Sequence, residues 1–93
     1  MEEDRRRYPR FDVRYPVKIV TSRGMFEGET KDMSAGGTFI WCQETLRAQE
    51  MCGLKIEIPT GSPLQLSARV IWSRAPDPDD ETSPRGMGVR FVW

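Results

Sequence analysis

The sequence contains no histidine, and this absence excludes several classes of chemistry. Catalytic Ser-His-Asp and Cys-His groups need an imidazole base, and most zinc sites include an imidazole ligand. Two cysteines, Cys42 and Cys52, make a poor metal site on their own. The sequence also shows no nucleophile–base pair and no phosphate-binding P-loop. We therefore expect neither an enzyme nor a metal site.

Long apolar runs and net charge are also missing. No segment approaches the roughly 20 apolar residues of a membrane span, and none resembles a signal peptide. We therefore predict a cytoplasmic protein without membrane insertion, whose two cysteines are reduced. With 14 basic and 14 acidic residues the formal charge is zero, which gives no general attraction to nucleic acid.

Arginine is abundant, and it is concentrated at the start of the chain. Arg5, Arg6, Arg7 and Arg10 fall within six residues, and Pro9 makes a helix unfavourable there. We predict that residues 1–11 form a flexible arm. Arginine binds phosphate through a planar fork and stacks on flat rings. A solvated tail, or the arginine excess of a GC-rich genome, would explain the same cluster.

The rest of the chain alternates apolar and polar residues as half-buried strands do. Six strands are predicted, over residues 12–22, 25–31, 38–42, 53–59, 64–74 and 86–93. In the fifth, Trp72 is expected on the apolar face that includes Val70. Residues 43–52 have some helical character, and the proline-rich acidic residues 75–84 are typical of a solvated loop. Short turns between most strands favour one all-β domain over residues 12–93, a six-stranded antiparallel β-barrel.

The segment Asp32-Met33-Ser34-Ala35-Gly36-Gly37 has two interpretations. The simpler one is a turn, because Asp and Ser stabilise turns and glycine permits positive φ or a close backbone approach. The other is recognition of guanine. A carboxylate accepts hydrogen bonds from N1–H and the N2 amine of guanine, while arginine donates to N7 and O6. Asp32 and the arginines of the arm would then bind one base together.

Two motifs in this order resemble the PilZ domain family. They are R-x-x-x-R, at Arg6 and Arg10, and D-x-S-x-x-G, at Asp32, Ser34 and Gly37, with "ARVIWSR" and "RGMGVRFV" further on. The resemblance spans the whole chain and implies a six-stranded barrel that binds cyclic di-GMP. It implies that the two arginines contact phosphates and guanines, that Asp32 and Ser34 bind a guanine, and that Gly37 shapes the turn. An arginine just before the first motif, here Arg5, resembles the pattern of family members that hold two stacked ligand molecules.

The sequence thus predicts a cyclic di-GMP receptor without any other cofactor. Ligand binding would order the arm and be transmitted to a downstream protein whose identity is unknown. Many family members continue into a C-terminal helix, which we expect to be absent or minimal here. An alternative is an adaptor barrel that binds a protein without nucleotide. A barrel that binds RNA or a single strand is less favoured, because the chain is neutral and shows no obvious aromatic stacking face.

Overall fold

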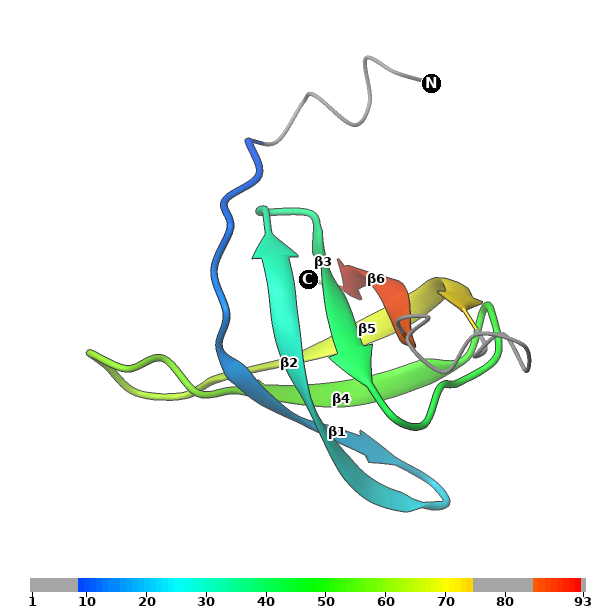
Figure 1. Cartoon of the computed structure of the whole chain (residues 1–93). Coiled ribbons are helices and arrows are strands. Elements are labelled where there is room, and N and C mark those ends of the chain that lie inside the picture. Colours follow the sequence, from blue (N-terminus) through cyan, green and yellow to red (C-terminus); the bar gives the residue numbers. More distant parts are fainter. Residues whose placement is uncertain (1–8, 75–84, 93) are drawn as a thin grey trace.

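The computed structural model describes residues 9–74 and 85–92, and these form a closed barrel of six antiparallel strands (Figure 1). The strands are β1 (Pro16–Thr21), β2 (Gly24–Met33), β3 (Gly37–Cys42), β4 (Met51–Ile56), β5 (Leu64–Arg74) and β6 (Gly86–Val92). Their order around the barrel is β1-β2-β3-β6-β5-β4, and β4 pairs with β1 to close it. The predicted six-stranded antiparallel barrel is confirmed. In the described ranges no helix has the length and apolar character needed to cross a membrane.

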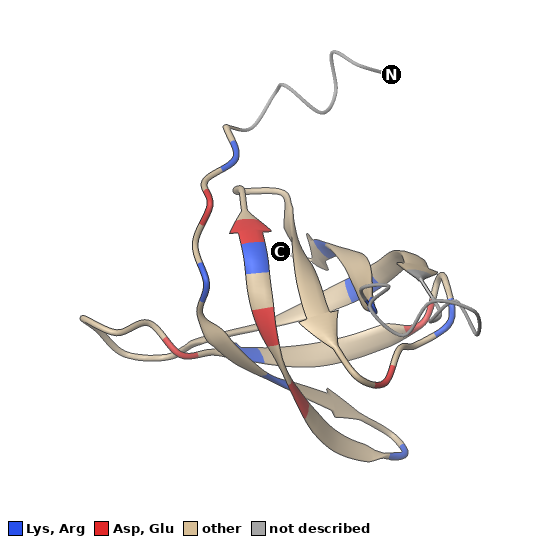
Figure 2. Cartoon of the chain, in the orientation of Figure 1, with Lys and Arg blue, Asp and Glu red and all other residues tan. Residues whose placement is uncertain are grey.

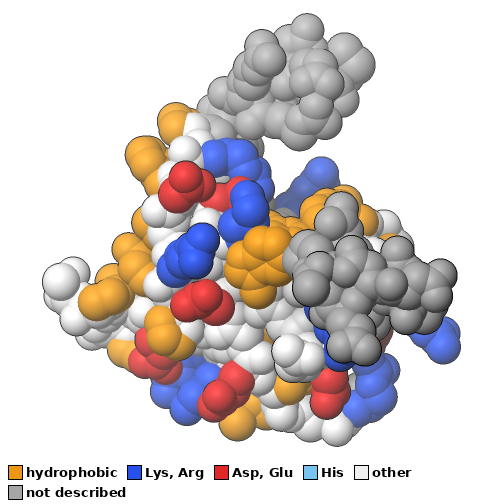
Figure 3. All heavy atoms as spheres, viewed as in Figure 1, with side chains coloured by type: hydrophobic (Ala, Val, Ile, Leu, Met, Phe, Trp, Pro, Cys, Tyr) orange, Lys and Arg blue, Asp and Glu red, His pale blue; other side chains and the backbone are white. Residues whose placement is uncertain are grey.

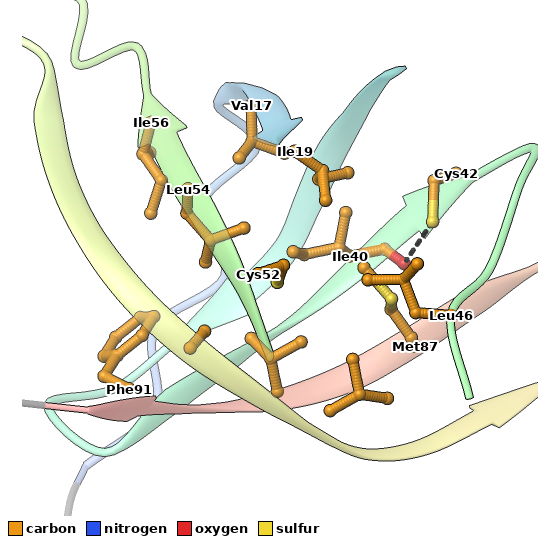
Figure 4. Packing of buried hydrophobic residues seen from close by; sticks show 13 residues of the cluster. Val17, Ile19, Ile40, Cys42, Leu46, Cys52, Leu54, Ile56, Met87 and Phe91 are labelled. Atoms are coloured by element: carbon orange, nitrogen blue, oxygen red, sulfur yellow. Dashed lines mark hydrogen bonds between the residues drawn. The ribbon is translucent and has the colours of Figure 1, made fainter. Parts of the chain in front are cut away.

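The interior is filled by alternate residues of β1, β3, β4, β5 and β6 (Figure 4), and the partly buried Phe26 and Met33 of β2 pack against them. On β6 these are Met87, Val89 and Phe91, as the alternation predicted. Leu46, from the segment between β3 and β4, is 3% exposed and completes this core. Each buried aliphatic or aromatic side chain stabilises the fold by roughly 1.5–3 kcal/mol. The buried hydrophobic residues are Val17, Ile19, Ile40, Cys42, Leu46, Cys52, Leu54, Ile56, Ala68, Val70, Met87, Val89 and Phe91.

The suggested helix at residues 43–52 does not form. Residues 43–50 are irregular, and β4 begins at Met51. Among residues 43–50, Leu46 is the buried hydrophobic residue, so a helix here would have no apolar stripe to pack against the barrel. Gln49 adopts a φ of 76°, which a right-handed helix does not allow.

Two β-bulges change which side chains face outward. The β2–β3 register shifts between Thr30 and Asp32, and the β5–β6 register shifts between Val70 and Trp72. One extra residue reverses the alternation beyond it, since successive side chains point to opposite faces of a sheet. Thr30 and Val70 are therefore buried, whereas Trp72 lies outside the barrel and is 45% exposed. The prediction that Trp72 shares the inner face with Val70 was wrong for this reason.

The segment before β1 runs along β2 and is fastened to it (Figure 1). The backbone N–H of Thr30 donates to the carbonyl of Tyr15 at 2.9 Å. The fully buried hydroxyl of Thr30 accepts from the N–H of Tyr15 at 2.9 Å and donates to the carbonyl of Val13. These bonds direct residues 9–11 toward the far end of β2.

Candidate ligand-binding site

Arg10 and Asp32 form an ion pair at the end of β2. The guanidinium Nη2 of Arg10 lies 3.0 Å from Oδ1 of Asp32, and Lys31 Nζ lies 3.9 Å from Oδ2. Figure 2 shows basic and acidic positions next to each other at the end of β2. The Asp32 side chain is 16% exposed and that of Arg10 is 48% exposed. Phe11 and Met33 exchange two backbone hydrogen bonds of 2.8 Å, which hold this part of the arm against β2. A partly buried carboxylate is thus placed beside two cations and keeps acceptor capacity on both oxygens.

The turn between β2 and β3 is organised by Ser34. Its hydroxyl accepts hydrogen bonds from the N–H groups of Gly36 at 3.1 Å and Gly37 at 3.3 Å, and its own N–H donates to the carbonyl of Gly37 at 2.9 Å. The φ of Gly37 is not positive, but a Cβ there would overlap the carbonyl oxygen of Val89 on β6. Gly37 is therefore needed for close approach between strands rather than for an unusual φ.

Three aromatic residues form a partly exposed platform beside this turn, in which Trp72 is the most exposed ring. The Phe39 ring stacks on Trp72 with centroids 5.2 Å apart and an interplanar angle of 22°. Trp41 meets Phe39 edge-on at 4.8 Å. We call Phe39, Trp41 and Trp72 the aromatic platform. The expectation that the barrel has no aromatic stacking face was wrong, because the bulge in β5 moves Trp72 out of the core.

Two glycines of β6 let the platform lie flat on the barrel. β6 runs between β3 and β5, and Gly86 and Gly88 occupy its outer face. A Cβ on Gly88 would lie 2.5 Å from Nε1 of Trp72, and one on Gly86 would lie 2.6 Å from Cζ of Phe39. Side chains at these positions would lift the rings away from the strand.

Two neighbouring hollows lie on this outer face. The larger, of about 580 Å³, is lined by Arg10, Ser34, Gly36, Gly37, Thr38, Phe39, Ile71, Trp72, Gly88, Val89 and Arg90. The smaller, of about 290 Å³, is lined by Arg10, Lys31, Asp32, Phe39, Trp41 and Trp72. They share Arg10, Phe39 and Trp72, and their volumes fall near or within the range of roughly 300–1,000 Å³ seen for small-molecule sites.

The lining combines apolar rings with an excess of positive charge. The basic side chains are Arg10, Lys31 and Arg90, and the acidic one is Asp32. Figure 3 shows Lys and Arg side chains gathered around exposed hydrophobic atoms on this face. Flat apolar surface, cations and one carboxylate suit an anionic ligand that carries purine bases.

The two cysteines are buried core residues and are not suited to bind a metal ion or to act as nucleophiles. Both thiols are free and buried, and burial raises the pKa of Cys42 and of Cys52 from 9.0 to about 11. Each is therefore a neutral thiol at physiological pH. Across the described part of the chain, no group of three or more His, Cys, Asp or Glu side chains is arranged to hold a metal ion.

A sequence model of the PilZ domain matches residues 4–93. The chain belongs to the PilZ domain family. By sequence, no curated protein matches it significantly.

Solved structures show the same fold. The PilZ domain of YcgR from Escherichia coli, solved with c-di-GMP, superposes with a TM-score of 0.78 at 17% identity, covering 95% of this chain and 78% of that one. The inhibitor of motility MotI/DgrA from Bacillus subtilis gives a TM-score of 0.78 at 23% identity, covering 96% of this chain and 43% of that one. The PilZ domain of CeSA from a cellulose-synthesising bacterium gives a TM-score of 0.67 at 21% identity, covering 91% of this chain and 81% of that one. This PilZ domain thus spans less than half of the MotI/DgrA chain.

The barrel of this PilZ domain brings four of the six predicted site residues to one end. Arg10, Asp32, Ser34 and Gly37 lie around the β2–β3 turn and the adjoining arm. Arg5 and Arg6 lie outside the described residues, as do residues 75–84 of the acidic loop and Trp93.

Sequence reasoning missed the aromatic platform, Lys31 and Arg90. The available signal was the pair of alternate glycines in "GMGVRF", because glycine inside a strand marks a close approach by another group. That signal identifies β6 as covered on its outer face, but it does not identify the rings that cover it.

Proposed function

We propose that this PilZ domain is a cyclic di-GMP receptor that acts as a binding module and not as an enzyme. The observation that carries the proposal is the Asp32–Arg10 pair placed directly beside the aromatic platform. The ligand offers guanine edges, flat purine faces and phosphates, and this surface has a complementary group for each. The PilZ domain of YcgR from Escherichia coli was solved with the same ligand, which supports the choice.

The smaller hollow suits one guanine. The Asp32 carboxylate would accept the N1–H and N2 amine protons, while the ring stacks on the platform. Asp32 need not release Arg10, because a carboxylate has about four acceptor sites and Arg10 occupies one oxygen. Arg10 would in turn donate to the N7 and O6 edge or to a phosphate.

The arm would complete the site. By family resemblance Arg6 binds phosphate or guanine together with Arg10, and Arg5 provides for a second stacked ligand molecule. Residues 1–11 would act as an arm on a barrel of residues 12–93, and its ordering would change the surface offered to a protein partner. The thiols and the ligand fit a cytoplasmic protein, with no nucleic-acid partner, no membrane insertion and no cofactor besides the ligand.

The aromatic platform also gives a second candidate, a site for single-stranded nucleic acid. Exposed rings stack bases with little regard to sequence. The neutral charge of the whole chain is unfavourable for that function, because such binding depends on neutralising many phosphates.

Calorimetric titration with cyclic di-GMP, cyclic di-AMP and a short oligonucleotide separates these functions. We expect cyclic di-GMP to bind at micromolar concentration or below, about −8 kcal/mol or stronger. Cyclic di-AMP should bind at least ten-fold more weakly, because adenine lacks the donors that Asp32 accepts. Absence of heat and of amide shifts with cyclic di-GMP would overturn the proposal. Binding of a protein partner that is indifferent to nucleotide would instead favour the adaptor barrel.

A further inference from the structure

Arg90 is an exposed arginine of β6 that belongs to neither sequence motif. It follows Gly88 on the outer face of the strand, so it stands at the end of the aromatic platform. Its partner on β3 is Gly37, which has no side chain to cover it. Arg90 also lines the larger hollow, together with Arg10 and Ser34.

The residue opposite Arg90 on β5 makes an arginine at this position unfavourable for the stability of the sheet. Arg69 is its direct cross-strand partner, and like charges directly opposite each other destabilise a sheet. Arg69 donates from Nη1 to the carbonyl of Gln49 at 3.3 Å. Within residues 9–74 and 85–92, no carboxylate lies within ion-pair distance of Arg90.

An uncompensated cation beside a hollow points to a ligand. A threonine or valine at this outer strand position would avoid the repulsion and would have a better strand propensity. Local rules that are broken without a compensating contact are expected at functional sites. The hollow already contains Arg10, the polar Ser34 turn and the platform, and Arg90 is the basic group that the barrel strands add to its lining.

We propose that Arg90 is a further ligand-binding residue, which binds a phosphate of the cyclic dinucleotide from the β6 side. This inference rests on the proposed function, and it assigns the larger hollow to the ligand as well. A cyclic dinucleotide has two phosphates in one ring. Arg10 would bind one phosphate, and Arg90 would bind the other. Because Arg90 is on a barrel strand, its backbone is already held in place before the ligand binds, which lowers the entropic cost of the contact.

The test compares two matched variants of the whole chain, Arg90→Ala and Arg69→Ala. Each removes one exposed arginine from the same opposed pair, so each relieves the same repulsion and changes net charge equally. We expect Arg90→Ala to weaken cyclic di-GMP binding about ten-fold, about 1.4 kcal/mol. Arg69→Ala, which does not line the hollow, should change the affinity less than about two-fold, within the scatter expected of surface substitutions. Arg90→Ala should be at least as stable to heat as the parent, whereas Arg69→Ala also loses its hydrogen bond to the Gln49 carbonyl and should change the stability little.

Two further measurements identify the contact. The affinity of Arg90→Ala should depend less on salt than that of the parent, because one exposed charge contact is lost. Phosphorus-31 spectra of bound ligand should show one phosphate resonance moving in Arg90→Ala and neither moving in Arg69→Ala. If affinity falls but both resonances stay in place, Arg90 contacts a base and the phosphate assignment is overturned.

Binding by the parent chain and by the Arg90 variant tests two separate claims, the proposed function and the role of Arg90. If the parent chain does not bind cyclic di-GMP, the proposed function itself is wrong. If the parent binds, and Arg10→Ala weakens binding while Arg90→Ala behaves as Arg69→Ala does, then only the role of Arg90 is refuted.

Discussion

The Asp32→Asn substitution tests the site most directly. It replaces one carboxylate oxygen by an amide NH2 group and removes the charge, with almost no change in the shape of the side chain. In the free protein it removes the ion pair with Arg10, whose nitrogen lies 3.0 Å from Oδ1. Arg10 is 48% exposed, so solvent screens the pair. The expected loss of unfolding free energy is therefore small, about 0.5 kcal/mol or less.

The effect on ligand binding should be much larger. In the proposed complex Asp32 accepts two guanine donors, and a hydrogen bond to a charged group contributes roughly 1.5–3 kcal/mol. The amide of asparagine would replace one acceptor by a donor that faces a guanine donor. We expect a loss of about 3 kcal/mol, which is over 100-fold in affinity. The preference for cyclic di-GMP over cyclic di-AMP should shrink with it.

Calorimetry with both dinucleotides measures the loss of binding affinity, and thermal unfolding of the free proteins measures the loss of stability. Glu27→Gln is the control, because it removes the same charge from an exposed position of β2 that pairs with Lys18 away from the site. The reasoning about Asp32 is refuted if the parent binds and Asp32→Asn lowers the affinity by no more than Glu27→Gln does.

Three other predictions concern the scaffold of the site. Gly88→Ala should displace the Trp72 ring, since the added Cβ would lie 2.5 Å from its Nε1, with a stability loss of about 1–3 kcal/mol by urea unfolding and weaker ligand binding. Thr30→Val should leave the N–H of Tyr15 without its hydroxyl partner and cost about 1–3 kcal/mol, measured in the same way. Burial raises the pKa of Cys42 and of Cys52 in the folded protein to about 11, so the stability of the barrel should fall in alkaline solution. Their contribution to stability is complete below the unfolded pKa of 9.0 and is lost as the pH rises toward 11, which urea unfolding at several pH values measures.

Each of these has its own control. Gly61→Ala adds a Cβ in open space and should be close to neutral, so an equal loss there would argue against the Trp72 contact. For Thr30, the comparison is Thr21→Val, which removes a hydroxyl at the end of β1 whose hydrogen bonds with Gly24 and Arg23 are exposed, and it should cost less. Replacing Cys42 and Cys52 together by alanine should flatten the alkaline decline; an unchanged slope would show that other groups cause it.

The sequence by itself determined the number of strands and most of the core. Alternation placed Met87, Val89 and Phe91 inside the barrel, and this was confirmed because a strand with one buried face must repeat every two residues. The two motifs identified the family, since they depend on residue identity and spacing alone. They also named the carboxylate and the turn residues around which the candidate site is built.

Only the tertiary structure decided which side chains meet on the outer face. The bulges in β2 and β5 reverse the alternation beyond Thr30 and Val70, and a bulge depends on the pairing of two strands, which neither strand specifies locally. Trp72 therefore reaches Phe39 across Gly88, three residues from three different strands. The same pairing sets Arg90 beside Gly37 at the end of this platform, where closure of the barrel brings β3 and β6 together.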